Sequence, residues 1–178
     1  EFSAGHLPGA LSLPLSQLRD RYEELPRDRE LCTYCAEGQR SFEDARRIVL
    51  EAYHDFTPEM ADLARRFFDE RWIDAELRPG KRTGAFCAST LPSLHPYVLL
   101  NYTGNLRDVM TLAHELGHGV HQCLAAGQGL FEQDTPLTMA ETASVFGEML
   151  VFRRPCLDER DPKLRLALLC GKLEDAFA

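Results

Sequence analysis

The residues best suited to chemistry in this chain are His114, Glu115 and His118, which stand in the order His-Glu-Leu-Gly-His. On an α-helix, positions i and i+4 are separated by roughly 40° of rotation and one turn of rise. Both imidazoles can therefore reach one ion, and zinc commonly takes neutral imidazole ligands. Glu115 is rotated toward the place of a zinc-activated water, where it can accept a proton. The pattern predicts a hydrolytic zinc site, although so short a pattern also arises by chance.

A catalytic zinc ion usually takes three protein ligands and keeps one position open. Glu141 follows His118 by 23 residues and is expected on a second helix, where it would complete a site of two histidines and one glutamate. Glu148 lies seven residues further along the same helix face, and we expect it to hold a ligand histidine through its second ring nitrogen. His121 shares the helix face of His114 and His118. The sequence therefore also allows a site of three histidines. If His121 is not a ligand, we expect it to support the ligands or to be structural.

The helix that would carry the two histidines is predicted over residues 106–126, with Asn105 as its N-cap and Gly127 at its end. One apolar stripe predicts the face that packs against the body. It consists of Leu106, Val109, Ala113, Leu116, Val120 and Leu124. The histidines lie well away from this stripe and are expected to face a cleft. Gly117 and Gly119 each cost about 1 kcal/mol relative to alanine in a helix, so a substrate or a packed neighbour is expected to approach closely there.

The remaining sequence after residue 41 also favours helices, with a few short strands. Ser41 is a candidate N-cap, and Thr57 precedes a proline at the first helical position, which favours a helix start. The predicted helices cover residues 42–53, 58–72, from 135–138 to about 153, and 162 to the C-terminus. Pro155 is expected to end the third of these. The predicted strands cover residues 85–87 and 96–102.

The segment LAHELGHGVHQ, followed by PLTMAETASVFGEML, resembles the oligoendopeptidase F branch of the thimet-oligopeptidase-like (M3) zinc peptidases. Two preceding and partly overlapping segments, EMADLARRFFDERWIDAELRPGKRTGAFCAS and LHPYVLLNYTGNLRDVMTLAHELGH, are similar to the part of that family just before its zinc helix. The resemblance covers about residues 42–178. It implies an α+β fold, mainly α-helical, with a zincin-type two-helix metal site, a short sheet and one Zn²⁺ per chain.

The resemblance also assigns roles to single residues. It implies that His114, His118 and Glu141 bind zinc and that Glu115 is the general base of a cytoplasmic metalloendopeptidase acting on oligopeptides. It further implies that residues 96–102 line the peptide cleft. Family members are several times longer, and their tyrosine and histidine that stabilise the tetrahedral intermediate correspond to positions beyond this chain. Stabilisation of the oxyanion often contributes much of the rate enhancement. The competing expectation is therefore that this chain binds zinc but cleaves peptides poorly or not at all.

Residues 1–41 form a different piece, and a boundary between two domains is expected at residues 41–42. EFSAGHLPGALSLPLSQL followed by ELCTYCAEGQRS resembles part of an α/β rhodanese domain. In this resemblance, Cys35 matches the sulfur-carrying cysteine and Arg40 the arginine that closes the active-site loop. A loop before a helix N-terminus favours a thiolate or persulfide, because backbone N–H groups and the helix dipole face it. Sulfurtransfer through Cys35 is therefore one alternative function, and a catalytically inert fusion fragment is another.

Composition excludes several classes of function. Of the 178 residues, 44% are hydrophobic, which is enough for a packed core. The sequence has no apolar run of about 18 residues, so a membrane span is not expected. The net charge is −8, and no cluster of basic residues predicts a nucleic-acid partner. The six cysteines are scattered and no secretion signal precedes them, so free thiols in a reducing cytoplasm are expected. The basic pair Lys81-Arg82 is expected to be exposed.

Overall fold

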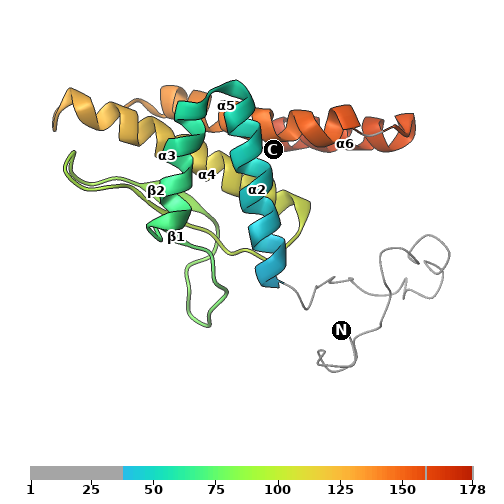
Figure 1. Ribbon diagram of the computed structural model, residues 1–178, viewed down its shortest axis with the longest axis horizontal. Coiled ribbons are helices and arrows are strands. Elements are labelled where there is room, and N and C mark those ends of the chain that lie inside the picture. Colours follow the sequence, from blue (N-terminus) through green and yellow to red (C-terminus); the bar gives the residue numbers. More distant parts are fainter. Residues whose placement is uncertain (1–37, 159, 178) are drawn as a thin grey trace.

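The structure is a computed structural model that describes residues 38–158 and 160–177. Its helices are α2 (Gly38–Phe56), α3 (Pro58–Asp69), α4 (Leu106–Ala125), α5 (Leu137–Asp158) and α6 (Pro162–Phe177), with a short 3-10 helix, η3 (Ala126–Gln128). Its strands are β1 (Ile73–Asp74), β2 (Phe86–Ala88) and β3 (Tyr97–Leu99). Helices dominate and the sheet is small (Figure 1), so the predicted α+β, mainly α-helical fold class is confirmed.

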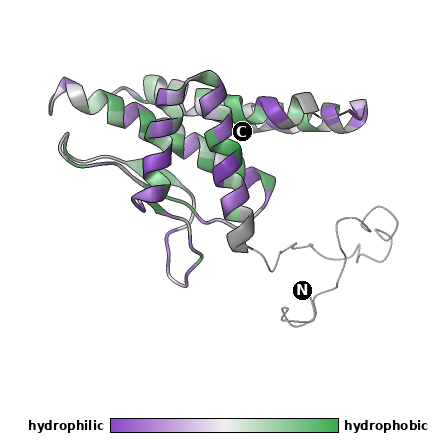
Figure 2. Cartoon of the chain, viewed as in Figure 1, coloured by the Kyte–Doolittle hydropathy of each residue, from purple (hydrophilic) through white to green (hydrophobic). Residues whose placement is uncertain are grey.

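Helices α2 and α3 pack against each other and against the body through one apolar face each. Thr57 caps α3 as predicted, because its Oγ1 accepts a hydrogen bond from the backbone N–H of Met60 at 3.1 Å, and Pro58 follows at the first position. Hydrophilic and hydrophobic residues alternate along both helices (Figure 2), as expected when one face is buried. The prediction that Ser41 caps α2 is wrong. The helix begins at Gly38, and the good helix formers Gln39 and Arg40 extend it toward the N-terminus.

Helix α4 begins as the sequence predicts. The side chain of Asn105 accepts a hydrogen bond from the backbone N–H of Asp108, whose carboxylate accepts one from the backbone N–H of Asn105, so the two form a capping box. The middle of the predicted apolar stripe is buried, and it consists of Val109, Ala113, Leu116 and Val120. Its two ends are not, since Leu106 and Leu124 are 50% and 63% exposed. The helix extends beyond the elements that cover its centre.

Helices α4 and α5 approach each other closely, backbone against backbone. A Cβ added to Gly117 would lie 2.7 Å from the carbonyl oxygen of Ala143 and 2.8 Å from Cα of Ser144. On the facing helix, a Cβ on Gly147 would meet the hydroxyl of Tyr53 and would lie 3.1 Å from Cα of Gly117. Gly117 therefore serves a packed neighbour. The same holds for Gly119, where a Cβ would lie 2.5 Å from Cζ of Phe67.

The sheet has the order β1-β3-β2, with β3 parallel to β1 and antiparallel to β2. Val98 of β3 is the common partner of Ile73 and Cys87. Val98 and Leu99, in the segment expected to line the peptide cleft, are therefore paired on both sides, whereas Tyr97 pairs with Ala88 of β2 alone. Among the described strands, β2 is the one that lies at an edge beside α4.

Lys81 corrects one expectation, because its side chain is only 4% exposed. Its Nζ lies 3.0 Å from Oδ1 of Asp74 and donates to the backbone carbonyls of Asp74, Glu76 and Leu100 at 2.8–2.9 Å. These acceptors come from two segments far apart in the sequence. Lys81 thus fastens the loop after β1 to the end of β3, and it is not free to meet a substrate.

Helix α5 continues through Pro155 to Asp158, so the predicted stop at this proline is wrong. A proline inside a helix removes one hydrogen bond and is costly. Burial of Val151, Phe152 and Cys156 on either side of it offsets that cost. Helix α6 then runs back along α5, so that the C-terminus lies over the middle of the molecule (Figure 1). None of the described helices is both long enough and apolar enough to cross a membrane.

The crossing of α4 and α5 makes a testable prediction. Replacing Gly117→Ala drives a Cβ into backbone atoms, which costs about 1–3 kcal/mol and outweighs the gain of about 1 kcal/mol in helix propensity. We therefore expect a lower midpoint of chemical denaturation. Gly171→Ala in α6 is the matched control, because nothing lies within 4 Å of its added Cβ. That control is expected to be neutral or stabilising, and equal effects of the two changes would contradict the crossing.

Candidate metal centre

The side chains of His114 and His118 on α4 converge with Glu141 on α5. One ligand atom from each of the three lies within 4.8 Å of the others. Oε2 of Glu141 is 3.3 Å from Nε2 of His114 and 3.7 Å from Nε2 of His118. Within residues 38–158 and 160–177, this is the one group of His, Cys, Asp or Glu side chains with such spacing. Two imidazole nitrogens and a carboxylate oxygen form a donor set that fits a zinc ion with an open position.

Glu148 and Lys172 lie on the other side of the His114 ring. Nδ1 of His114 is 3.4 Å from Oε2 of Glu148, and Oε1 of Glu148 accepts a hydrogen bond from Nζ of Lys172. A proton on Nδ1 shared with Glu148 leaves the lone pair of Nε2 facing Glu141. Glu148 lies beside the second ring nitrogen of His114, as the sequence led us to expect. That it holds His114 in place as a metal ligand stays a prediction.

The same contacts set the electrostatics of the two histidines. The hydrogen bond to Glu148 raises the pKa of His114, although burial opposes the rise. Burial, followed by the charge of His114, lowers the pKa of His118. Burial also acts to raise the pKa of Glu148, but hydrogen bonds from His114 and Lys172 outweigh it and hold that pKa below its ordinary value. His118 is thus favoured in the neutral form that binds metals, with Glu148 favoured as a carboxylate.

Glu115 is the other unusual carboxyl group of the site. The residue is 6% exposed, and its Oε2 has no hydrogen-bond partner among the described residues. The backbone N–H of Cys87 in β2 donates a hydrogen bond to this carboxylate. Burial raises the pKa of Glu115 to about 7, with the charge of His114 opposing the rise and that of Glu141 adding to it. A carboxyl group with a pKa near neutrality can both accept and release a proton.

Of the remaining predicted site residues, His121 alone has a described side chain. His121 is half-buried on α4 and is not a member of the group formed by His114, His118 and Glu141. Cys35 lies outside the described residues. Arg40 lies in the first turn of α2, and its side chain is likewise outside the described set.

Two residues near the centre were missed by the sequence reasoning. Ser144 is fully buried, and its Oγ lies 2.9 Å from Oε2 and 3.0 Å from the carbonyl oxygen of Glu141. Its position one helical turn after Glu141 was an available signal. Lys172 offered no such signal, because it follows Glu148 by 24 residues and lies on another helix.

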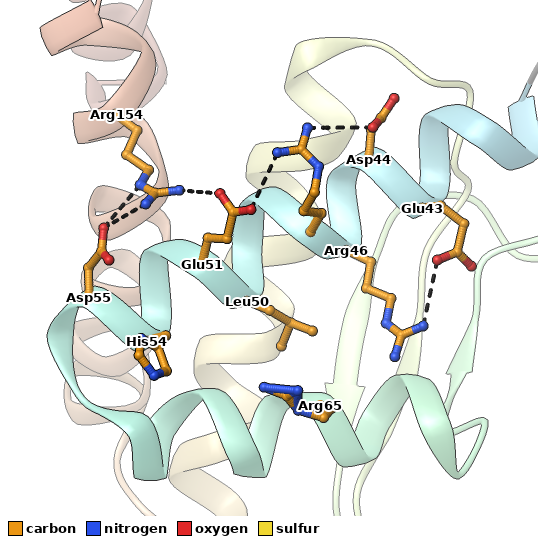
Figure 3. A pocket seen from close by; sticks show the side chains of 10 residues that line it. Glu43, Asp44, Arg46, Leu50, Glu51, His54, Asp55, Arg65 and Arg154 are labelled. Carbon is orange, nitrogen blue, oxygen red and sulfur yellow. Dashed lines mark hydrogen bonds and ion pairs between the residues drawn. The ribbon is translucent and has the colours of Figure 1, made fainter.

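A groove between α2, α3 and α5 (Figure 3) is lined by none of the residues of the candidate metal centre. Its lining is mostly charged and includes Glu43, Asp44, Arg46, Arg47, Glu51, Asp55, Arg65 and Arg154. Many of these charges neutralise one another. Arg154 of α5, for example, lies 2.6 Å from Glu51 and 2.8 Å from Asp55 of α2. The groove therefore marks a contact that ties α5 to α2.

The family of the chain follows from comparison with known proteins. A model of peptidase family M3 matches residues 40–178, which include both helices that carry the cluster. The chain belongs to peptidase family M3. A model of the rhodanese-like domain matches residues 1–63, so both resemblances inferred from the sequence are confirmed. The two matches overlap over residues 40–63, which include most of α2 and the start of α3.

Relatives of this M3 peptidase chain include oligopeptidases. Oligoendopeptidase F (chromosomal) from Lactococcus lactis subsp. cremoris is 36% identical over 115 residues, which are 64% of this chain and 19% of that protein. Oligopeptidase PepF from Bacillus subtilis (strain 168) is 29% identical over 135 residues, 75% of this chain and 20% of that protein. The chain therefore spans about a fifth of the length of these relatives.

A solved structure from Chlamydophila abortus, provisionally assigned as a peptidase, has the same arrangement of elements. It matches with a TM-score of 0.69 and 29% identity, over 83% of this chain and 24% of that one. The PZ peptidase A structure with inhibitor 2 matches with a TM-score of 0.55 at 21% identity, over 61% of this chain and 19% of that one. The second match shows the shared fold alone.

The raised pKa of Glu115 makes a prediction about the metal-free protein. The ordinary value of 4.5 applies when the chain is unfolded, and the folded value is about 7. The free energy of unfolding should therefore fall as the pH rises from about 4.5 to about 7, by on the order of 2–4 kcal/mol. Glu115→Gln removes this loss, so the metal-free variant should be the more stable one at pH 8 but not at pH 4.5.

Urea denaturation at the two pH values, with a chelator present, measures the effect. Glu132→Gln is the control, since Glu132 is exposed and lies outside the centre. The explanation fails if Glu115→Gln and the unsubstituted chain have the same stability at pH 8.

Proposed function

We propose that this M3 chain is a zinc-dependent metalloendopeptidase that hydrolyses peptide bonds in oligopeptides. One observation carries the proposal: the imidazoles of His114 and His118 and the carboxylate of Glu141 face a common point. Beside them lies a buried carboxylate, Glu115, with an unpartnered oxygen and a pKa near neutrality. The first three residues would hold one Zn²⁺ and the fourth would be the general base. The names of the oligopeptidase relatives support the substrate class.

Each residue has a task that follows from its surroundings. Zinc held by the two histidines and Glu141 would polarise the scissile carbonyl and make a nearby water more acidic. Oε2 of Glu115 would accept a proton from the attacking water and later pass it to the leaving amine. Glu148 would keep the proton of His114 on Nδ1, so that Nε2 stays available to the ion.

The sheet offers a way to orient the peptide. Strand β2 lies at an edge of the described sheet, and its Cys87 donates a backbone hydrogen bond to Glu115. An extended peptide that lies along the outer edge of β2 would therefore pass beside the general base. Recognition by strand addition uses main-chain hydrogen bonds, which suits a peptidase that accepts varied side chains. Within this proposal the protein acts in the cytoplasm, and residues 42–178 form its peptidase part.

Zinc content tests the metal site directly. Elemental analysis of chain purified without added metal should find about one zinc per chain, because the donor set is complete. Glu141→Ala removes one of the three donors and should lower the zinc content strongly, while Glu132→Ala, at an exposed position, should leave it unchanged. A folded protein without zinc would overturn the proposal.

A second test separates the base from the ligands. Glu115→Gln keeps the size of the side chain and lies outside the donor set, so the variant should retain its zinc. Peptide hydrolysis should fall by about 10²–10⁴-fold, the usual contribution of a positioned general base. The assay is cleavage of an internally quenched fluorescent oligopeptide. Undiminished cleavage by the variant would remove Glu115 from the mechanism.

The rhodanese-like match over residues 1–63 favours a second candidate function. Cys35 would carry a persulfide in sulfur transfer, with Arg40 closing its loop. Thiosulfate-dependent persulfide formation that disappears in Cys35→Ser would support it, and persistence in that variant would exclude Cys35.

A further inference from the structure

We propose that Ser144 is a positioning residue that holds the carboxylate of Glu141 toward the two histidines. The inference rests on the proposed zinc site and adds a residue to it. The observation behind it is a single hydroxyl group: Oγ of Ser144 lies 2.9 Å from Oε2 of Glu141, the oxygen that faces His114 and His118.

Ser144 cannot easily move away from this position. Its side chain is fully buried, and its Cα and carbonyl oxygen lie 2.8 Å and 3.1 Å from the place where Gly117 would carry a Cβ. Gly117 lies between His114 and His118 on α4. The serine therefore occupies a point of close backbone contact between the two helices that carry His114, His118 and Glu141, and its hydroxyl is fixed relative to both.

The hydroxyl has one proton and two nearby acceptors. The alternative acceptor is the backbone carbonyl oxygen of Glu141, at 3.0 Å. Hydrogen bonds to a charged acceptor are roughly twice as strong as those between neutral groups. Because the Ser144 side chain is fully buried, water does not replace its hydrogen bond when that bond is lost. The carboxylate is thus the preferred partner of Ser144.

Glu141 needs such a tether more than the histidines do. Its side chain is 42% exposed, against 27% for His114 and 14% for His118. A long, half-exposed glutamate samples several rotamers, and ordering it on a metal ion costs conformational entropy. A fixed hydrogen bond removes part of that cost before the ion arrives. Partners of this kind around a ligand typically change metal affinity by 10–100-fold.

The test compares Ser144→Ala with Thr142→Val. Thr142 is a hydroxyl residue on the same helix turn, but it is exposed and its Oγ1 donates to the backbone carbonyl of Thr138 at 2.8 Å. The dissociation constant for zinc is measured by competition with a chelator, and the visible spectrum of the Co²⁺-loaded protein reports the geometry of the ligands. Ser144→Ala should raise the dissociation constant about tenfold and alter the Co²⁺ spectrum, whereas Thr142→Val should change neither.

Each outcome decides the inference. Unchanged zinc affinity and an unchanged Co²⁺ spectrum in Ser144→Ala, or an equal loss in Thr142→Val, would overturn it while leaving the metal site intact. If the unsubstituted chain binds neither zinc nor Co²⁺, the metal site and this inference both fall. Circular dichroism checks that each variant folds. Should Ser144→Ala not fold, Ser144→Gly removes the same hydroxyl group without adding a possible zinc ligand, and the same tenfold loss is expected of it.

Discussion

The architecture of this chain depends on how closely α4 can approach α5. Gly117 and Gly147 face each other at the crossing, where a side chain on either would meet backbone or the hydroxyl of Tyr53. The candidate metal-binding group takes two residues from one helix and one from the other. A wider separation of the two helices would move Glu141 on α5 away from His114 and His118 on α4. Each of the two glycines is unfavourable in an isolated helix. Together they permit the close crossing that brings the three donor atoms together.

Around that crossing, the acidic groups differ in how their charge is balanced. Glu148 is matched by Lys172 and His114, and Glu141 contacts two imidazoles and a buried hydroxyl. Glu115 has a backbone N–H as its described partner and one oxygen without any. A carboxyl group left so poorly compensated destabilises the fold at neutral pH, yet the same property makes it a competent proton acceptor. This opposition between stability and reactivity is common at active sites.

The local elements could be read from the sequence with few errors. Thr57 and Asn105 cap their helices as expected, and the centre of the apolar stripe of α4 is buried. The failures share a cause. Pro155 continues a helix, and Lys81 is buried among carbonyl groups, because contacts from distant segments outweigh the local preference of the residue. Local signals describe what a segment favours alone, and packing decides the result where the two disagree.

For the candidate metal centre, the sequence by itself determined which residues could act and on which helix face the histidines lie, because helical periodicity relates His114 to His118 directly. Only the tertiary structure decided that Glu141, and not His121, meets both of them. It also decided that Ser144 and Lys172 support the two carboxylates and that Glu115 loses contact with water. The physical reason is that distances between helices and the exclusion of solvent arise from packing across the chain, which no local pattern encodes.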